Sequence, residues 1–163
     1  MAAQPGKGPS FSKVMIVVLE NTGYKIALKQ PFLSELVRRG ASFTGFFARY
    51  RPSQPNYIAM VAGDTFGVRS NDNVTLDERN LVDLLEDKGK SWKVYAEGFP
   101  GNCFLGAKSG VYVRKHVPFL SFKNIQSAPA RCARIFEAGQ FDADVRDGSL
   151  PEFAMYIPNN LNN

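Results

Sequence analysis

The chain has 163 residues, of which 44% are hydrophobic and 21% are charged, a composition typical of one globular domain and not of a disordered or collagen-like chain. Its longest aliphatic run, from Val14 to Leu19, is far shorter than the ~20 residues that span a bilayer, so we expect no transmembrane segment. The net charge is +5, and residues 1–51 hold eight basic and two acidic side chains. This bias suits an anionic partner such as a phosphate ester, nucleic acid or lipid headgroup, although a solvated surface is the simpler explanation.

Strand and helix patterns alternate along the chain. After a Gly- and Pro-rich leader at 1–12, which we expect to be flexible, the apolar run at 14–19 predicts a strand buried on both faces. The later patterns predict helices at 32–39, 56–62, 80–86, 131–138 and 141–147, strands at 41–50, 92–95 and 153–157, and a long irregular segment at 102–129. This order predicts an α/β domain whose mostly parallel sheet is covered on both faces.

Polar residues follow each predicted strand. They are Glu20 and Asn21 after the first, Ser53 and Asn56 after the second, Glu97 after the third, and Asn159, Asn160, Asn162 and Asn163 after the fourth. In an α/β sheet such positions meet in one crevice. Carboxylate and amide oxygens suit a divalent cation, and a serine just before a helix lies where backbone N–H groups bind an anion. The pattern therefore predicts a combined phosphate and metal site.

Simpler interpretations stay open for each of these residues. Glu20 and Asn21 fit a solvated strand end, and Ser53 fits a helix N-cap. His116, which follows Arg114 and Lys115, is either a phosphate or leaving-group contact or a surface loop residue. One histidine and two cysteines exclude a four-ligand Cys/His zinc site, and the two cysteines form either one disulfide or two buried thiols.

Several motifs together resemble one known family. In chain order they are Leu19-Glu20-Asn21, Arg51-Pro52-Ser53-Gln54-Pro55-Asn56-Tyr57, Gly63-Asp64-Thr65, Asn80-Leu81-Val82-Asp83-Leu84-Leu85, Ser91-Trp92-Lys93-Val94-Tyr95-Ala96-Glu97 and Tyr112-Val113-Arg114-Lys115-His116-Val117-Pro118-Phe119. The chain from about residue 13 onward resembles the phosphoesterases that include acid phosphatases and phosphatidylcholine-type phospholipases C. That family belongs to the alkaline-phosphatase-like superfamily.

The resemblance implies a three-layer α/β/α fold and metal-dependent hydrolysis of phosphate esters. It implies that Glu20, Asn21 and Ser53 bind a divalent cation, that Ser53 is the nucleophile, and that Asn56 and His116 act near the phosphate. It also implies a secreted or periplasmic protein, which would suit a Cys103–Cys132 disulfide. Arg51 or Lys115 would hold the phosphoryl oxygens.

Two departures from the family pattern qualify this interpretation. Arg51 stands where the family often has a histidine before Pro-Ser. The chain stops at Asn163, where a stretch with Asp and His would begin, so residues 13–163 are expected to be the N-terminal part of a single phosphoesterase domain. Activity would then require a missing C-terminal fragment as partner.

The alternative to an enzyme is a non-catalytic, basic anion-binding fragment or pseudoenzyme for nucleic acid or lipid headgroups. A sulfatase or phosphodiesterase relative is a further alternative within the enzyme class.

Overall fold

A computed structural model describes residues 11–162. It contains a four-stranded parallel sheet in the order β1-β6-β2-β5, formed by Val14–Val17, Phe153–Ile157, Trp92–Ala96 and Ile135–Glu137. The helices are α1 (Tyr24–Ala27), α2 (Pro31–Arg39), α3 (Ser53–Ala62), α4 (Leu81–Asp87), α5 (Lys123–Gln126), α6 (Pro129–Cys132) and α7 (Gly139–Arg146). The long irregular segment holds a small hairpin, β3 (Lys108–Ser109) with β4 (Tyr112–Val113), and two 3-10 turns, η1 (Arg114–His116) and η2 (Pro118–Ser121).

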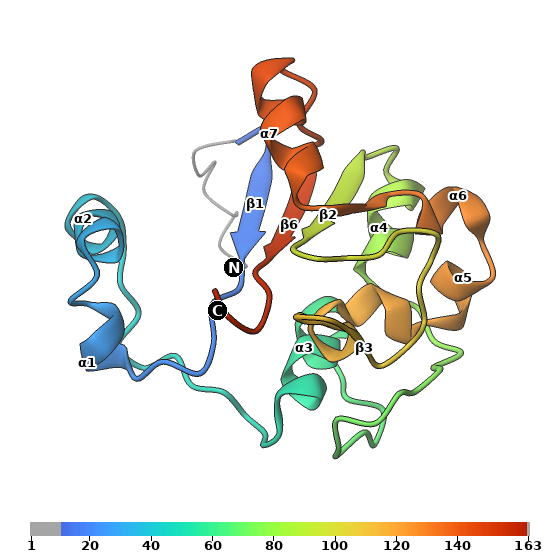
Figure 1. Ribbon diagram of the computed structural model, residues 1–163, viewed down its shortest axis with the longest axis horizontal. Helices are drawn as coiled ribbons and strands as arrows, with labels where there is room; N and C mark the ends of the chain where they lie inside the picture. The colour runs from blue at the N-terminus through green and yellow to red at the C-terminus, as the bar shows by residue number, and fades with distance from the viewer. Residues whose placement is uncertain (1–10, 163) are drawn as a thin grey trace, which may run out of the picture.

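The two central strands, β2 and β6, separate two unlike layers. On one face Trp92, Val94 and Met155 join the main apolar core, where the Trp92 ring packs 5.9 Å from Phe119 of η2. On the other face α7 covers the sheet, and its Phe141 ring lies 5.4 Å from that of Tyr95. Figure 1 shows α7 on one side of the strands and α3 to α6 on the other. The expected three-layer α/β fold with a mostly parallel sheet is therefore confirmed.

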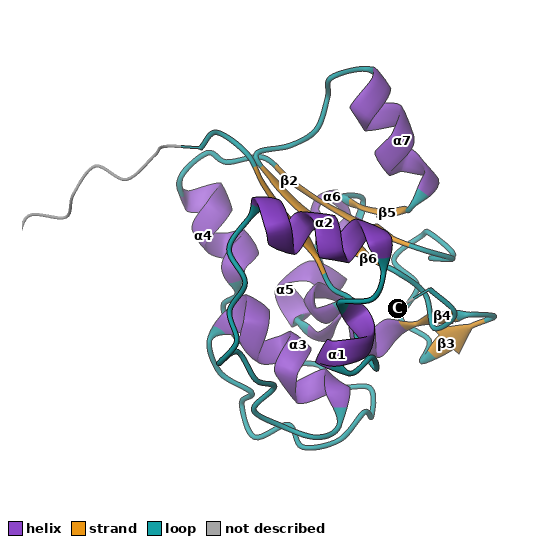
Figure 2. Ribbon diagram, turned by 90° about the vertical axis from the view of Figure 1, so that its left-hand side faces the viewer, coloured by secondary structure: helices purple, strands orange, loops and turns teal. Residues whose placement is uncertain are grey.

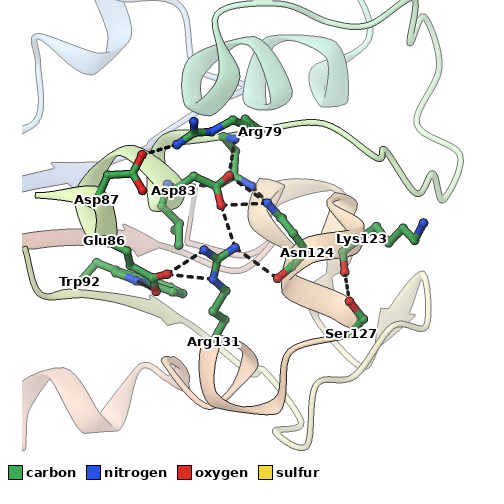
Figure 3. Close-up of polar contacts among 11 residues, drawn as sticks. Arg79, Asp83, Glu86, Asp87, Trp92, Lys123, Asn124, Ser127 and Arg131 are labelled. Carbon is green, nitrogen blue, oxygen red and sulfur yellow. Dashed lines mark hydrogen bonds and ion pairs between the residues drawn. The ribbon is translucent and has the colours of Figure 1, made fainter. Parts of the chain in front are cut away.

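A partly buried polar cluster joins three helices within the larger layer (Figure 3). Arg131 of α6 pairs with Asp83 and Glu86 of α4 at 2.8 and 2.7 Å, and Asn124 of α5 donates to the Asp83 carboxylate. The Asn80 side chain caps α4 by accepting a hydrogen bond from the Val82 backbone N–H. These contacts fix α4, α5 and α6 beneath the sheet.

Residues 41–50 do not form the predicted strand. They form a loop whose Phe43, Phe46 and Phe47 are 76%, 85% and 78% exposed. The second edge strand of the sheet comes instead from Ile135–Glu137, inside a segment predicted to be helical. Burial against the free edge of β2 outweighs the local helical pattern there, because the Val94 N–H donates to the Arg134 carbonyl and Ile135 enters the core.

The first strand is also less buried than expected. Val14 and Ile16 pack on the core, but Met15 and Val17 are 41% and 50% exposed. Helices α1 and α2 contain no buried residue, and Figure 1 shows them standing apart from the sheet; Figure 2 views the molecule from their side. Within residues 11–162, no helix has the length and apolar character needed to cross a membrane.

Most of the remaining predicted elements are present in the structure. Strand 153–157 and the helices near 32–39, 56–62, 80–86 and 141–147 are present, with ends shifted by a few residues. The Cys103–Cys132 disulfide is present, with the two Cα atoms 5.4 Å apart, and it ties the irregular segment to α6. Residues 1–10 of the predicted leader lie outside the described residues.

Candidate active site

The site begins where the first strand ends. Asn21 adopts a left-handed backbone conformation with φ of 59°, which asparagine tolerates better than most residues. The chain therefore turns directly after Glu20, and the Asn21 side-chain amide donates a 2.9 Å hydrogen bond to Glu20 Oε1. The adjacent acid and amide thus form one unit at the carboxyl end of β1.

Ser53 reaches this unit from the start of α3. Pro52 is the N-cap of that helix and Ser53 is its first residue, so the expectation that Ser53 is the N-cap is wrong. The Ser53 hydroxyl donates instead to Glu20 Oε1 at 3.3 Å. Because the hydroxyl is not used for capping, it is available at the positive end of a ten-residue helix.

His116 arrives from the irregular segment and completes the group. Its side chain is 1% exposed, so the surface-loop interpretation is wrong, and its Nε2 lies 2.7 Å from Glu20 Oε1. The Arg114 guanidinium holds this segment in place by donating to the Val74, Leu105 and Leu120 carbonyl oxygens. A buried arginine therefore organises the turn that carries His116.

Tyr57 is a site residue that the sequence reasoning missed. It is 3% exposed, and its ring stacks on His116 with a centroid separation of 5.0 Å and an angle of 17°. Burial and the negative charge of Glu20 raise the pKa of the Tyr57 hydroxyl, so it stays protonated. Its position four residues after Ser53 places both on one side of α3, and that helical spacing was the available signal.

The electrostatics of Glu20 favour its charged form. Burial raises the pKa of Glu20, but His116, the Ser53 hydroxyl and the charge of Lys115 outweigh burial and hold the pKa below its usual value. A half-buried carboxylate is therefore available as a ligand at neutral pH. It lies among a hydroxyl, an amide and a cationic side chain.

The Asn56 side chain forms hydrogen bonds with the loop that precedes α3. Its Oδ1 accepts hydrogen bonds from the Arg49 and Tyr50 backbone N–H groups at 3.0 Å each, and its Nδ2 donates to the Tyr50 carbonyl at 2.8 Å. Asn56 lines the cavity, but its side chain ties the preceding loop to α3. A contact between Asn56 and phosphate stays a prediction.

Glu97 and the asparagines after β6 form a separate group. The Glu97 carboxylate accepts hydrogen bonds from the Tyr156 hydroxyl, the Asn159 N–H and the Asn162 side chain, at 3.0, 3.0 and 2.7 Å. These residues do not line the cavity beside Ser53. Asn163 lies outside the described residues.

One cavity of about 1040 Å³ lies against this site. Its lining includes Glu20, Asn21 and Ser53, together with the cationic residues Arg49 and Arg51. The donor chemistry of the first three suits a hard divalent cation, because each offers oxygen. No cluster of three or more His, Cys, Asp or Glu side chains suited to a metal occurs within residues 11–162. The three oxygen donors therefore fit only a part of the ligand set of a metal site.

Comparison with known proteins places this geometry in context. The model of the Phosphoesterase family matches residues 11–163. A probable acid phosphatase of Kluyveromyces lactis is 36% identical over 96% of this chain, and the phosphate-repressible acid phosphatase of Penicillium chrysogenum is 34% identical over 96%. The phosphatidylinositol-3-phosphatase of Mycobacterium tuberculosis is 30% identical over 94%. The chain spans 39%, 40% and 58% of the length of these three relatives.

Proposed function

This chain belongs to the phosphoesterase family, and we propose that it hydrolyses phosphate esters with Ser53 as the nucleophile. The observation that carries the proposal is the convergence of the Ser53 hydroxyl and His116 on one carboxylate oxygen of Glu20, at 3.3 and 2.7 Å. The relatives named acid phosphatase and phosphatidylinositol-3-phosphatase support the reaction class.

The chemistry assigned to the chain is a two-step transfer. Ser53 gives up its hydroxyl proton to solvent as Oγ bonds to phosphorus, the bond from phosphorus to the leaving oxygen breaks, and that oxygen takes up a proton from solvent as the alcohol departs. Water then cleaves the phosphoserine, which releases phosphate and restores the hydroxyl. Arg51 lines the cavity and the charge of Lys115 acts on Glu20, which supports a role for both in neutralising phosphoryl oxygens.

Glu20, Asn21 and Ser53 would hold a divalent cation as part of a larger ligand set. When bound, such a cation lowers the pKa of a coordinated hydroxyl and screens the charge of the phosphate. His116 positions the Glu20 carboxylate through their contact, and Tyr57 fixes the plane of the histidine ring. A second polypeptide that completes the ligand set, and secretion or export of the protein, also remain proposals.

Turnover of p-nitrophenyl phosphate, with and without EDTA, tests the function. We expect chelator-sensitive turnover by the wild-type chain, supplied with the remaining part of the domain if the chain alone is inactive. Ser53→Ala should abolish turnover, whereas Ser34→Ala, an exposed serine on α2, should leave it unchanged. Phosphate binding that survives without any turnover would favour a non-catalytic anion-binding module instead, and steep loss of binding with salt would identify its electrostatic origin.

A further inference from the structure

The cavity beside Ser53 is lined by both polar and apolar side chains. Glu20, Asn21 and Ser53 are polar lining residues, and Phe46, Phe47 and Met60 are apolar ones, here together called the apolar wall. The three apolar side chains are 85%, 78% and 43% exposed. Large apolar side chains that are exposed around one cavity are uncommon on a protein unless they bind something.

The apolar wall is aligned with the proposed nucleophile by the helix itself. Ser53, Asn56 and Met60 are spaced by three and four residues along α3, so they lie along one face of the helix. All three line the cavity. A group that extends from Ser53 along this face therefore meets Met60 within two helical turns.

The loop that carries the two phenylalanines is attached to the same helix. The Asn56 side chain accepts hydrogen bonds from the Arg49 and Tyr50 N–H groups and donates to the Tyr50 carbonyl. These three bonds fix the loop only a few residues after Phe47. Arg49 and Arg51, which flank the anchored residue Tyr50, also line the cavity.

We propose that the substrates of this site are phosphate esters with an apolar leaving group about the size of an aromatic ring. This inference rests on the proposed function. The phosphoryl group would lie at Ser53 and the basic residues, and the leaving group would pack against Phe46, Phe47 and Met60. The volume of about 1040 Å³ is ample for such a molecule, because ligand pockets usually measure about 300–1,000 Å³.

Binding of two non-hydrolysable phosphonates tests this inference without requiring turnover. Isothermal titration would compare benzylphosphonate, which carries a ring, with methylphosphonate, which does not. We expect the ring to tighten binding to the wild-type protein about tenfold, because part of its apolar surface leaves water. The Phe46→Ala/Phe47→Ala double variant should bind the two phosphonates about equally.

Phe43→Ala is the matched control. Phe43 lies in the same loop and is 76% exposed, but it does not line the cavity, so its removal should preserve the tenfold preference. All three side chains are exposed, so the variants should keep the wild-type melting temperature. Equal binding of both phosphonates to the wild-type protein, or a preference that survives in the double variant, would overturn the inference while leaving the proposed function intact. Failure of both phosphonates to bind would contradict the anion site, and with it the proposed function.

Discussion

His116 Nε2 lies 2.7 Å from Glu20 Oε1, which joins the turn after β1 to a 3-10 turn deep in the irregular segment. The contact is nearly enclosed, since the histidine side chain is 1% exposed and that of Glu20 is 16% exposed. Glu20 Oε1 accepts the hydrogen bond from the Ser53 hydroxyl, and His116 contacts the same oxygen. Glu20 is therefore the residue on which the site converges.

Glu20→Gln should reduce turnover about a hundredfold or more, because the amide removes the negative charge that a cation and His116 both require. The measurement is kcat for p-nitrophenyl phosphate across a titration of divalent cation. Glu35→Gln is the control, since Glu35 lies on α2 and pairs with the neighbouring Arg38. Unchanged kcat and unchanged cation dependence in Glu20→Gln would remove Glu20 from the site.

Tyr57 should contribute to stability through its ring rather than its hydroxyl. Tyr57→Leu removes the stack on His116 and should lower the free energy of unfolding by about 2 kcal/mol. Tyr57→Phe keeps the ring and should cost less than about 1 kcal/mol. Urea unfolding measures both. Equal losses in the two variants would show that the stack does not stabilise the protein.

Because of Asp144, the free energy of unfolding should fall at acidic pH. Burial raises its pKa, but hydrogen bonds from Lys93, Tyr95 and two further side chains outweigh burial and hold the pKa well below its usual value. A depressed folded-state pKa adds stability that is present above the unfolded pKa of about 3.9 and is lost as pH falls through and below that value.

Asp144→Asn should therefore cost about 2 kcal/mol at pH 7, and the difference from the wild-type protein should shrink as the pH falls below about 4. Urea unfolding at pH 7, 5 and 3 measures this difference. Asp142→Asn, on the same helix, is the control and should show no such convergence. A difference that is constant across these pH values would contradict the assignment.

The Cys103–Cys132 disulfide should stabilise the irregular segment that carries His116. A closed loop with a sequence separation of 29 corresponds to roughly 3–4 kcal/mol in the chain-entropy treatment. Reduction should lower the melting temperature of the wild-type protein. It should leave that of a Cys103→Ala/Cys132→Ala variant unchanged. A wild-type melting temperature that does not respond to reductant would show that the bond adds no stability.

The sequence predicts the central strands well because β2 and β6 are short apolar runs bounded by turn residues. It predicts Glu20, Asn21 and Ser53 as neighbours because each follows or precedes a regular element. It misplaces the strand at 41–50 because an aromatic-rich stretch forms a strand only where a sheet edge accepts it. The free edge of β2 pairs instead with Ile135–Glu137, a tertiary contact that no local pattern reveals.

The features of the site also divide into those that the sequence indicates and those that it does not. Helical spacing after Ser53 could have indicated Tyr57, but the stack on His116 depends on the path of the irregular segment. Likewise, the type of residue at Asn56 does not reveal that both ends of its amide anchor the loop at Tyr50. Such roles depend on backbone groups that the sequence does not bring together.

The most direct measurement is acid quenching during turnover of a phosphate ester, followed by peptide mapping by mass spectrometry. The account predicts one added phosphate on the peptide that contains Ser53 in the wild-type protein, and none in Ser53→Ala. Sustained turnover by Ser53→Ala, or a phosphate found on a different residue, would contradict the assignment of Ser53 as the nucleophile.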